Sequence, residues 1–133
     1  MGQAAFMAAL IAGSVVLLLI HIVVQAFAAT RELGSAWNAG PRDEGLKPKG
    51  VLAGRAERAL RNYLETFPAF GILALTLIAM GRVDGLGLIG ALLWLAARIA
   101  YLPLYLAGIP YVRSLAWSIA AAGLLLMVVR TFV

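Results

Sequence analysis

Residues Ala4–Ala29, AAFMAALIAGSVVLLLIHIVVQAFAA, form an apolar stretch that carries no formally charged residue. A transmembrane helix needs about 20 consecutive apolar residues, and this stretch exceeds that length. A cleaved signal peptide is the alternative, because Ala26-Phe27-Ala28 mimics a cleavage site. No basic segment precedes the stretch, and its apolar part is longer than that of an ordinary signal peptide. We therefore expect a membrane-spanning helix.

The composition of the whole chain agrees with a membrane protein. Of the 133 residues, 63% are hydrophobic and 13% are charged, and the mean hydropathy is +0.95. Soluble domains carry roughly 25% charged residues, so a soluble globular domain and a disordered chain are both excluded. The chain has no cysteine. This excludes disulfides, thiolate metal sites and a thiol nucleophile of the protein's own.

Three more apolar segments follow along the chain, separated by turn-forming residues. Residues 30–54 contain five glycines and two prolines among charged residues, which predicts a loop. The sequence therefore predicts an all-α membrane protein, a four-transmembrane-helix antiparallel bundle that forms a single domain over 1–133. We expect its helices at about 4–29, 55–80, 86–106 and 112–130.

The basic residues indicate the orientation of the bundle. Eleven Lys and Arg against six Asp and Glu give a net charge of +5. Most of these cations lie in the 30–54 loop or just after it, whereas the opposite side has only Arg82 and Arg130. The positive-inside rule then places the 30–54 loop in the cytoplasm and both termini outside it, in a bacterial inner membrane. We interpret the positive charge as a topology signal and expect no nucleic-acid partner.

Ionisable side chains inside the expected spans gather at one depth. At 100° per residue, Arg58, Arg61, Asn62 and Glu65 share one stripe of the second helix, about 100° wide. Such groups cost about 2.5–3.5 kcal/mol each on insertion scales, so they tend to face protein or water. A second set of polar residues lies at the matching level of the third and fourth helices: Arg98, Tyr101, Tyr105, Arg113 and Ser114.

Two interpretations of these polar residues are possible. In the simpler one, Arg58 and Arg61 reach lipid phosphates, and Arg61 pairs with Glu65 at i, i+4. In the other, the groups enclose a pocket of net positive charge with one carboxylate. That pocket suits a ligand with several anionic groups and one cationic group, and the common depth of the residues favours it.

At this point the residues resemble a known family. Arg58–Pro68, RALRNYLETFP, resembles the R-A-x-x-N-x-x-E-x-x-P signature of the MAPEG family, the membrane-associated proteins in eicosanoid and glutathione metabolism. Residues 97–101, ARIAY, together with Tyr105 and Arg113–Ser114, resemble its third- and fourth-helix motifs. The resemblance implies a homotrimer of four-helix bundles, with glutathione bound between neighbouring subunits on the cytoplasmic side.

The resemblance also implies roles for individual residues. Glu65 would take the α-ammonium group of glutathione, Arg113 would stabilise its thiolate, and Ser114 would stand beside it as a second catalytic residue. The chain departs from some relatives at Thr66 and Trp117, where those relatives have tyrosine. The full set of residues implied to bind glutathione is Arg31, Arg58, Arg61, Asn62, Glu65, Arg98, Tyr101 and Tyr105.

Elementary chemistry agrees with these implied roles. A free thiol with a pKa of about 8.5 is mostly protonated at pH 7, and an adjacent arginine favours the reactive thiolate. A chain without cysteine must borrow such a thiol, and glutathione would supply it as co-substrate. The electrophile would be a hydrophobic small molecule or a lipid that arrives from the bilayer. We expect no metal, because the single histidine, His21, has no second histidine to complete a site.

Several functions are consistent with this sequence. The first is a glutathione-dependent transferase or peroxidase, and the second is a non-catalytic lipid-binding or accessory protein of the same fold. A small multidrug transporter is a third, but such transporters depend on a carboxylate in the first helix, which has none here. Gly85–Gly90, GLGLIG, matches a GxGxxG nucleotide motif but follows a turn rather than a strand. We interpret its glycines as contacts for helix packing.

Overall fold

A computed structural model of residues 1–133 shows an all-helical chain without strands. Four of its five helices are long and apolar enough to cross a membrane. The prediction of an all-α, four-span membrane protein is therefore confirmed. The helices are α1 Gln3–Leu33, α2 Ser35–Ala39, α3 Val51–Ala79, α4 Leu86–Ala107 and α5 Pro110–Phe132.

The helix ends around the expected 30–54 loop differ from the prediction. Helix α1 continues to Leu33, α3 begins at Val51, and the intervening residues include the short helix α2. Helix α1 stops where Gly34 adopts a φ of +93°, a conformation that favours glycine. The Glu32 carboxylate accepts hydrogen bonds from the backbone N–H groups of Lys49 and Gly50, at 2.6 and 3.0 Å. This contact stabilises the start of α3 at an earlier residue than the apolar pattern indicates.

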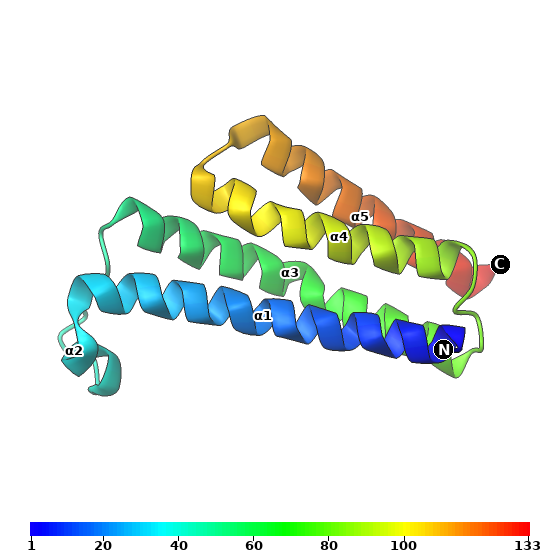
Figure 1. Ribbon diagram of the computed structural model, residues 1–133, viewed down its shortest axis with the longest axis horizontal. Helices are drawn as coiled ribbons and strands as arrows, with labels where there is room; N and C mark the ends of the chain where they lie inside the picture. Colours follow the sequence, from blue (N-terminus) through cyan, green and yellow to red (C-terminus); the bar gives the residue numbers. More distant parts are fainter.

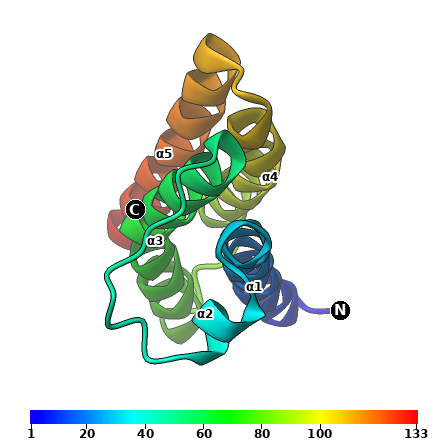
Figure 2. The same ribbon diagram turned by 90° about the vertical axis from the view of Figure 1, so that its left-hand side faces the viewer.

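The four long helices form an antiparallel bundle (Figure 1). Helix α2, the start of α3 and the α4–α5 turn lie at one end of the bundle, which we call the α2 end. The two termini and the α3–α4 turn lie at the other end. The view from the α2 end shows α1 beside α3, and α4 and α5 as a hairpin (Figure 2). The Arg55 guanidinium donates to the Leu106 carbonyl at 3.1 Å, which joins the start of α3 to the end of α4.

Small residues allow α4 and α5 to approach closely. A Cβ atom added at Gly90 would lie 2.4 Å from the Gly123 carbonyl oxygen, and one at Gly123 would lie 2.5 Å from the Gly90 oxygen. No side chain fits between the two helices at this crossing. The structure thus supports the packing interpretation of the Gly85–Gly90 segment, because Gly87 and Gly90 are both buried against neighbouring segments.

Aromatic side chains fill the centre of the bundle between α1, α3 and α4. The rings of Phe70 and Trp94 stack with centroids 4.1 Å apart, and Tyr63 lies 5.6 Å from Trp94. His21 of α1 stacks on Tyr63 at 4.7 Å, and the Tyr63 hydroxyl donates to the Ser14 carbonyl. These buried rings fix the rotation of α3, and so determine which face of α3 points toward α4 and α5.

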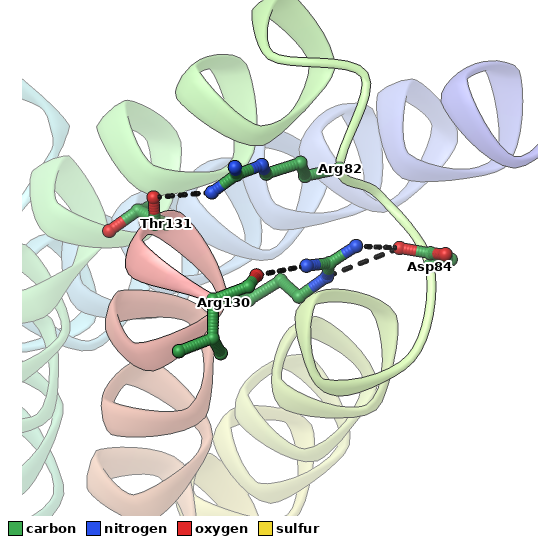
Figure 3. A network of polar contacts seen from close by, with 5 residues as sticks. Arg82, Asp84, Arg130 and Thr131 are labelled. Atoms are coloured by element: carbon green, nitrogen blue, oxygen red, sulfur yellow. Dashed lines mark hydrogen bonds and ion pairs between the residues drawn. The ribbon is translucent and has the colours of Figure 1, made fainter.

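The end of the bundle that carries the termini is closed by polar contacts of its two arginines (Figure 3). Arg130 donates to Asp84 at 2.6 and 3.2 Å and to the carbonyl of Val133. Arg82 donates to the Thr131 carbonyl at 2.9 Å. Both arginines therefore hold the C-terminal turn of α5 against the α3–α4 turn.

Candidate functional site

An open groove lies between α3, α4 and α5 toward the α2 end, with a volume of about 350 Å³. That volume falls within the range of small-molecule sites, roughly 300–1,000 Å³. We call it the basic groove. Its lining residues come from the first half of α3, the last turns of α4 and the first turns of α5: Arg58, Arg61, Asn62, Glu65, Tyr101, Tyr105, Arg113, Ser114, Trp117 and Ser118.

The structure brings together eight of the ten residues singled out in the sequence. Helix geometry explains the convergence, because the residues of the α3 stripe line the same groove as residues from the end of α4 and the start of α5. The two remaining residues are Arg31 and Arg98. In the single chain they lie elsewhere, and each is described below.

Tyr105 connects two arginines across the basic groove. The Arg58 Nε atom donates to the Tyr105 hydroxyl at 3.2 Å. The Arg113 guanidinium lies over the Tyr105 ring, with its carbon 4.4 Å from the ring centroid. A cation over a tyrosine face is attracted by the ring quadrupole. One tyrosine of α4 therefore holds a cation from α3 and a cation from α5 at the same point.

Of the two carboxylates near the groove, Glu57 forms an ion pair and Glu65 does not. Arg61 pairs with Glu57 at 2.7 Å, and both side chains are more than half exposed, at 67% and 55%. The alternative pairing of Arg61 with Glu65 is therefore wrong in this structure. Glu65 has no ion pair of its own. It is the one carboxylate that lines the groove without a basic partner.

Arg98 lies behind the wall of the groove rather than in its lining. Its side chain is fully buried, and its Nη1 atom donates to Asn62 Oδ1 at 2.8 Å. The guanidinium carbon lies 4.4 Å from the ring centroid of Tyr101 and 5.4 Å from that of Tyr63. Arg98 is buried because α3 and α4 pack together at this level, so that α3 covers the face of α4 that carries Arg98.

Arg31 lines a second groove of about 380 Å³, between the end of α1 and the start of α3. The neighbouring Glu32 is engaged with the backbone before α3 and forms no ion pair with Arg31. Within a single chain, Arg31 therefore lies at the α2 end of the bundle but outside the basic groove. The second groove is lined by Ala28, Arg31, Glu32, Gly50, Val51, Leu52 and Ala53.

Two residues of the groove, Trp117 and Ser118, were not assigned to the site from the sequence, which marked Trp117 only as a position where some relatives have tyrosine. They lie four residues after Arg113 and Ser114, so they follow on the same face of α5 one turn further. That i, i+4 spacing is the signal by which they could have been found. The Ser118 hydroxyl donates to the Ser114 carbonyl at 3.0 Å, and the Ser114 hydroxyl donates to the Pro110 carbonyl at 3.4 Å.

The charges of the groove favour an anionic ligand. Three lining arginines face one lining carboxylate, and one of those arginines is already paired with Glu57. Guanidinium groups form planar, paired hydrogen bonds to carboxylates, which lysine does not. No group of three or more His, Asp or Glu side chains is arranged to hold a metal ion.

The fold and the groove together define an integral membrane protein, a four-helix bundle with a basic site at one end. A model of the MAPEG family matches residues 4–133, essentially the whole chain. The protein belongs to the MAPEG family. Comparisons with curated proteins and with solved structures found no match.

Proposed function

We propose that the basic groove binds glutathione and that the protein is a glutathione-dependent membrane transferase or peroxidase. The observation that carries the proposal is the charge pattern of the groove: arginines from α3 and α5 around Tyr105, and one unpaired carboxylate, Glu65. Glutathione offers two carboxylates, one ammonium group and a thiol. Family membership supports the same assignment, because MAPEG proteins are generally associated with glutathione or eicosanoid metabolism.

The residues of the groove fit this ligand group by group. Arg58 and Arg61 would bind its carboxylates, Asn62 would bond its backbone, and Glu65 would bind its ammonium group. Arg113 would lie beside the sulfur with Ser114, while Tyr101 and Tyr105 would form the adjoining wall. A guanidinium group at the sulfur stabilises the thiolate over the thiol, because it favours the negatively charged form.

The reaction would use the thiolate as nucleophile toward a hydrophobic electrophile that enters from the bilayer. In the transferase reaction the thiol proton leaves to solvent and the sulfur electron pair forms the bond to carbon. The electrons of the bond broken at that carbon either depart with a leaving group such as halide or move along an activated double bond, which then takes a proton from solvent. In the peroxidase reaction a lipid hydroperoxide is reduced to the alcohol and water, while two glutathione molecules are oxidised to the disulfide. The groove opens on the surface where Trp117 is 40% exposed, which gives an apolar molecule access.

The assembly and the orientation belong to the same proposal. We infer a homotrimer in which the site forms between neighbouring subunits at the α2 end. In that arrangement a neighbouring chain can contribute Arg31, which lies at the same end of the bundle as the basic groove. We further propose that the α2 end faces the cytoplasm of a bacterial inner membrane. The positive-inside rule supports this orientation, because the α2 end carries Arg31, Arg42, Lys47 and Lys49, whereas the opposite end has only Arg82 and Arg130.

A non-catalytic lipid-binding protein or an accessory subunit is the second candidate. The open, partly aromatic wall at Trp117 favours it, since the same groove would accept a lipid with an anionic headgroup. The two candidates differ in turnover: the transferase conjugates glutathione to chlorodinitrobenzene, and the lipid-binding protein does not.

Calorimetric titration of the purified protein with glutathione tests the proposal. We expect saturable binding that weakens about 10- to 100-fold in Glu65→Gln, because a hydrogen bond to a charged group contributes about 1.5–3 kcal/mol. Arg58→Ala should weaken binding to a similar degree. Asp43→Asn, which changes one carboxylate of the exposed segment before α3, is the matched control and should bind like the wild type. Absence of glutathione binding in the wild type would overturn the proposal.

A further inference from the structure

Asn62 is hydrogen-bonded from the side of the bundle that faces away from the basic groove. Its Oδ1 atom accepts from Arg98 Nη1 at 2.8 Å, and Arg98 is fully buried. Asn62 itself lines the basic groove. A carboxamide has one acceptor oxygen and one donor NH2 group, on opposite branches of the same carbon. With the oxygen held by Arg98, the NH2 group is the part of Asn62 that is left for a ligand.

We propose that Arg98 is a positioning residue that fixes the Asn62 carboxamide, so that the groove presents an N–H donor at this point and selects a carbonyl or carboxylate oxygen of the ligand. The proposal rests on the proposed function, in which that ligand is glutathione. It assigns to Arg98 a role through Asn62, in place of direct contact with glutathione.

The reverse orientation of the carboxamide is disfavoured by the chemistry of arginine. A guanidinium group has five N–H donors and no acceptor, so a flipped Asn62 would bring its NH2 group against another donor. Asn62 is also the only protein group that accepts a hydrogen bond from Arg98. A flip would leave the buried cation without a protein acceptor, which is costly in the bundle interior.

The position of Arg98 is itself fixed by aromatic packing. Its guanidinium carbon lies near the rings of Tyr101 on α4 and Tyr63 on α3, at 4.4 and 5.4 Å. Tyr63 is in turn held by its hydroxyl bond to the Ser14 carbonyl and by stacking on His21. The chain of contacts therefore runs from α1 through Tyr63 and Arg98 to the wall of the groove. It makes the Asn62 carboxamide a preorganised donor, which lowers the cost of ordering it on binding.

The hydrogen bond can be tested without any ligand, because the chain has only two asparagines, Asn38 and Asn62. Labelling with ¹³C,¹⁵N-asparagine gives two side-chain carboxamide signals, and Asn38→Ala assigns them. We expect Arg98→Met to shift the Asn62 signal and to leave Asn38 unchanged, whereas Arg98→Gln, which keeps an N–H donor, should shift it less. An Asn62 signal that is the same in the wild type and Arg98→Met would overturn the proposal.

A double-mutant cycle tests the effect on binding. Arg98→Met should weaken glutathione binding about 5- to 10-fold in the wild-type background. It should have less than about a twofold effect in an Asn62→Ala background, because the two residues act as one unit. Equal weakening in both backgrounds would show that Arg98 acts only through general packing, and would overturn the proposal.

If Arg98→Met fails to fold, Asn62→Asp provides a second test of the positioning role of Arg98. The new carboxylate still accepts from Arg98, but it places an oxygen rather than an NH2 group toward the groove. We expect at least a 10-fold loss of glutathione affinity with unchanged thermal unfolding, and wild-type affinity in this variant would overturn the positioning role. If the wild type itself binds no glutathione, the proposed function fails, and the carboxamide signals still decide whether Arg98 orients Asn62.

Discussion

Gly90→Ala should destabilise the bundle through one contact between α4 and α5. The added Cβ would lie 2.4 Å from the Gly123 carbonyl oxygen and 2.8 Å from Met127 Cγ, whereas ordinary contacts of such an atom begin at 3.4 Å. The helices must therefore separate by about 1 Å at this point, and the nearest obstacle is backbone rather than a flexible side chain. Overpacking of this kind costs typically 1–3 kcal/mol. The intrinsic gain of alanine over glycine in a helix, about 0.5–1 kcal/mol, offsets only part of that cost.

Gly71→Ala is the matched control for this substitution. Gly71 also lies inside a long helix, but apart from its chain neighbours and the backbone of its own helix no atom lies within 4 Å of its ideal Cβ position. The same chemical change should therefore leave stability unchanged or raise it by up to about 1 kcal/mol. Reversible unfolding in mixed micelles, followed by circular dichroism as sodium dodecyl sulfate is added, measures both variants. Equal stability of Gly90→Ala and the wild type, or an equal loss in Gly71→Ala, would refute the packing argument.

Three further predictions concern charged residues. Arg130 hydrogen-bonds to Asp84 and lowers the pKa of that carboxyl below its ordinary value of 3.8. The stability advantage of the wild type over Asp84→Asn should therefore be full at neutral pH, and it should disappear as the pH falls through the lowered pKa. Thermal unfolding at several pH values measures this advantage. A difference in stability that does not change with pH would contradict the ion pair. Glu32→Ala should loosen the segment that leads into α3, at a cost of about 0.5–1.5 kcal/mol, which is typical of a lost hydrogen bond. Hydrogen exchange of that segment measures the effect, and Glu32→Gln should retain most of the protection. Unchanged exchange in Glu32→Ala would show that this contact does not stabilise the segment. Glu57→Gln should release Arg61 toward the groove and strengthen glutathione binding up to about fivefold, as expected for an exposed ion pair. Calorimetry tests it, and weaker binding would show that Glu57 supports the site.

The sequence was sufficient to predict the class of fold because span length and charge content are local properties. The ends of the helices were harder to predict from the sequence, because they depend on contacts between residues that are distant along the chain. Helix α3 begins at Val51, directly after Lys49 and Gly50, whose backbone N–H groups bind the Glu32 carboxylate. Glu32 lies 17 residues before Lys49 and 18 before Gly50. No periodicity within α3 itself carries this information.

Helical register predicted most of the candidate site for a similar reason. The angular positions of Arg58 and Glu65 follow from their spacing alone, but the choice of ion-pair partners does not. Arg61 has carboxylates at both i−4 and i+4, and the structure selects Glu57. Register also places Arg98 on the same side of α4 as Tyr101 without revealing that α3 covers it, because burial depends on how two helices pack.

If the groove binds glutathione and Arg113 stabilises its thiolate, the bound thiol should ionise at a lower pH than the free thiol. The most direct test is a pH titration of the ultraviolet absorbance of the thiolate in the glutathione-saturated protein, with Arg113→Gln as the comparison. We expect the bound thiol of the wild type to ionise well below the free thiol pKa of about 8.5, and Arg113→Gln to return its pKa toward that value. Bound glutathione that stays protonated at neutral pH in the wild type, or that ionises identically in both proteins, would show that Arg113 does not stabilise a thiolate in the groove.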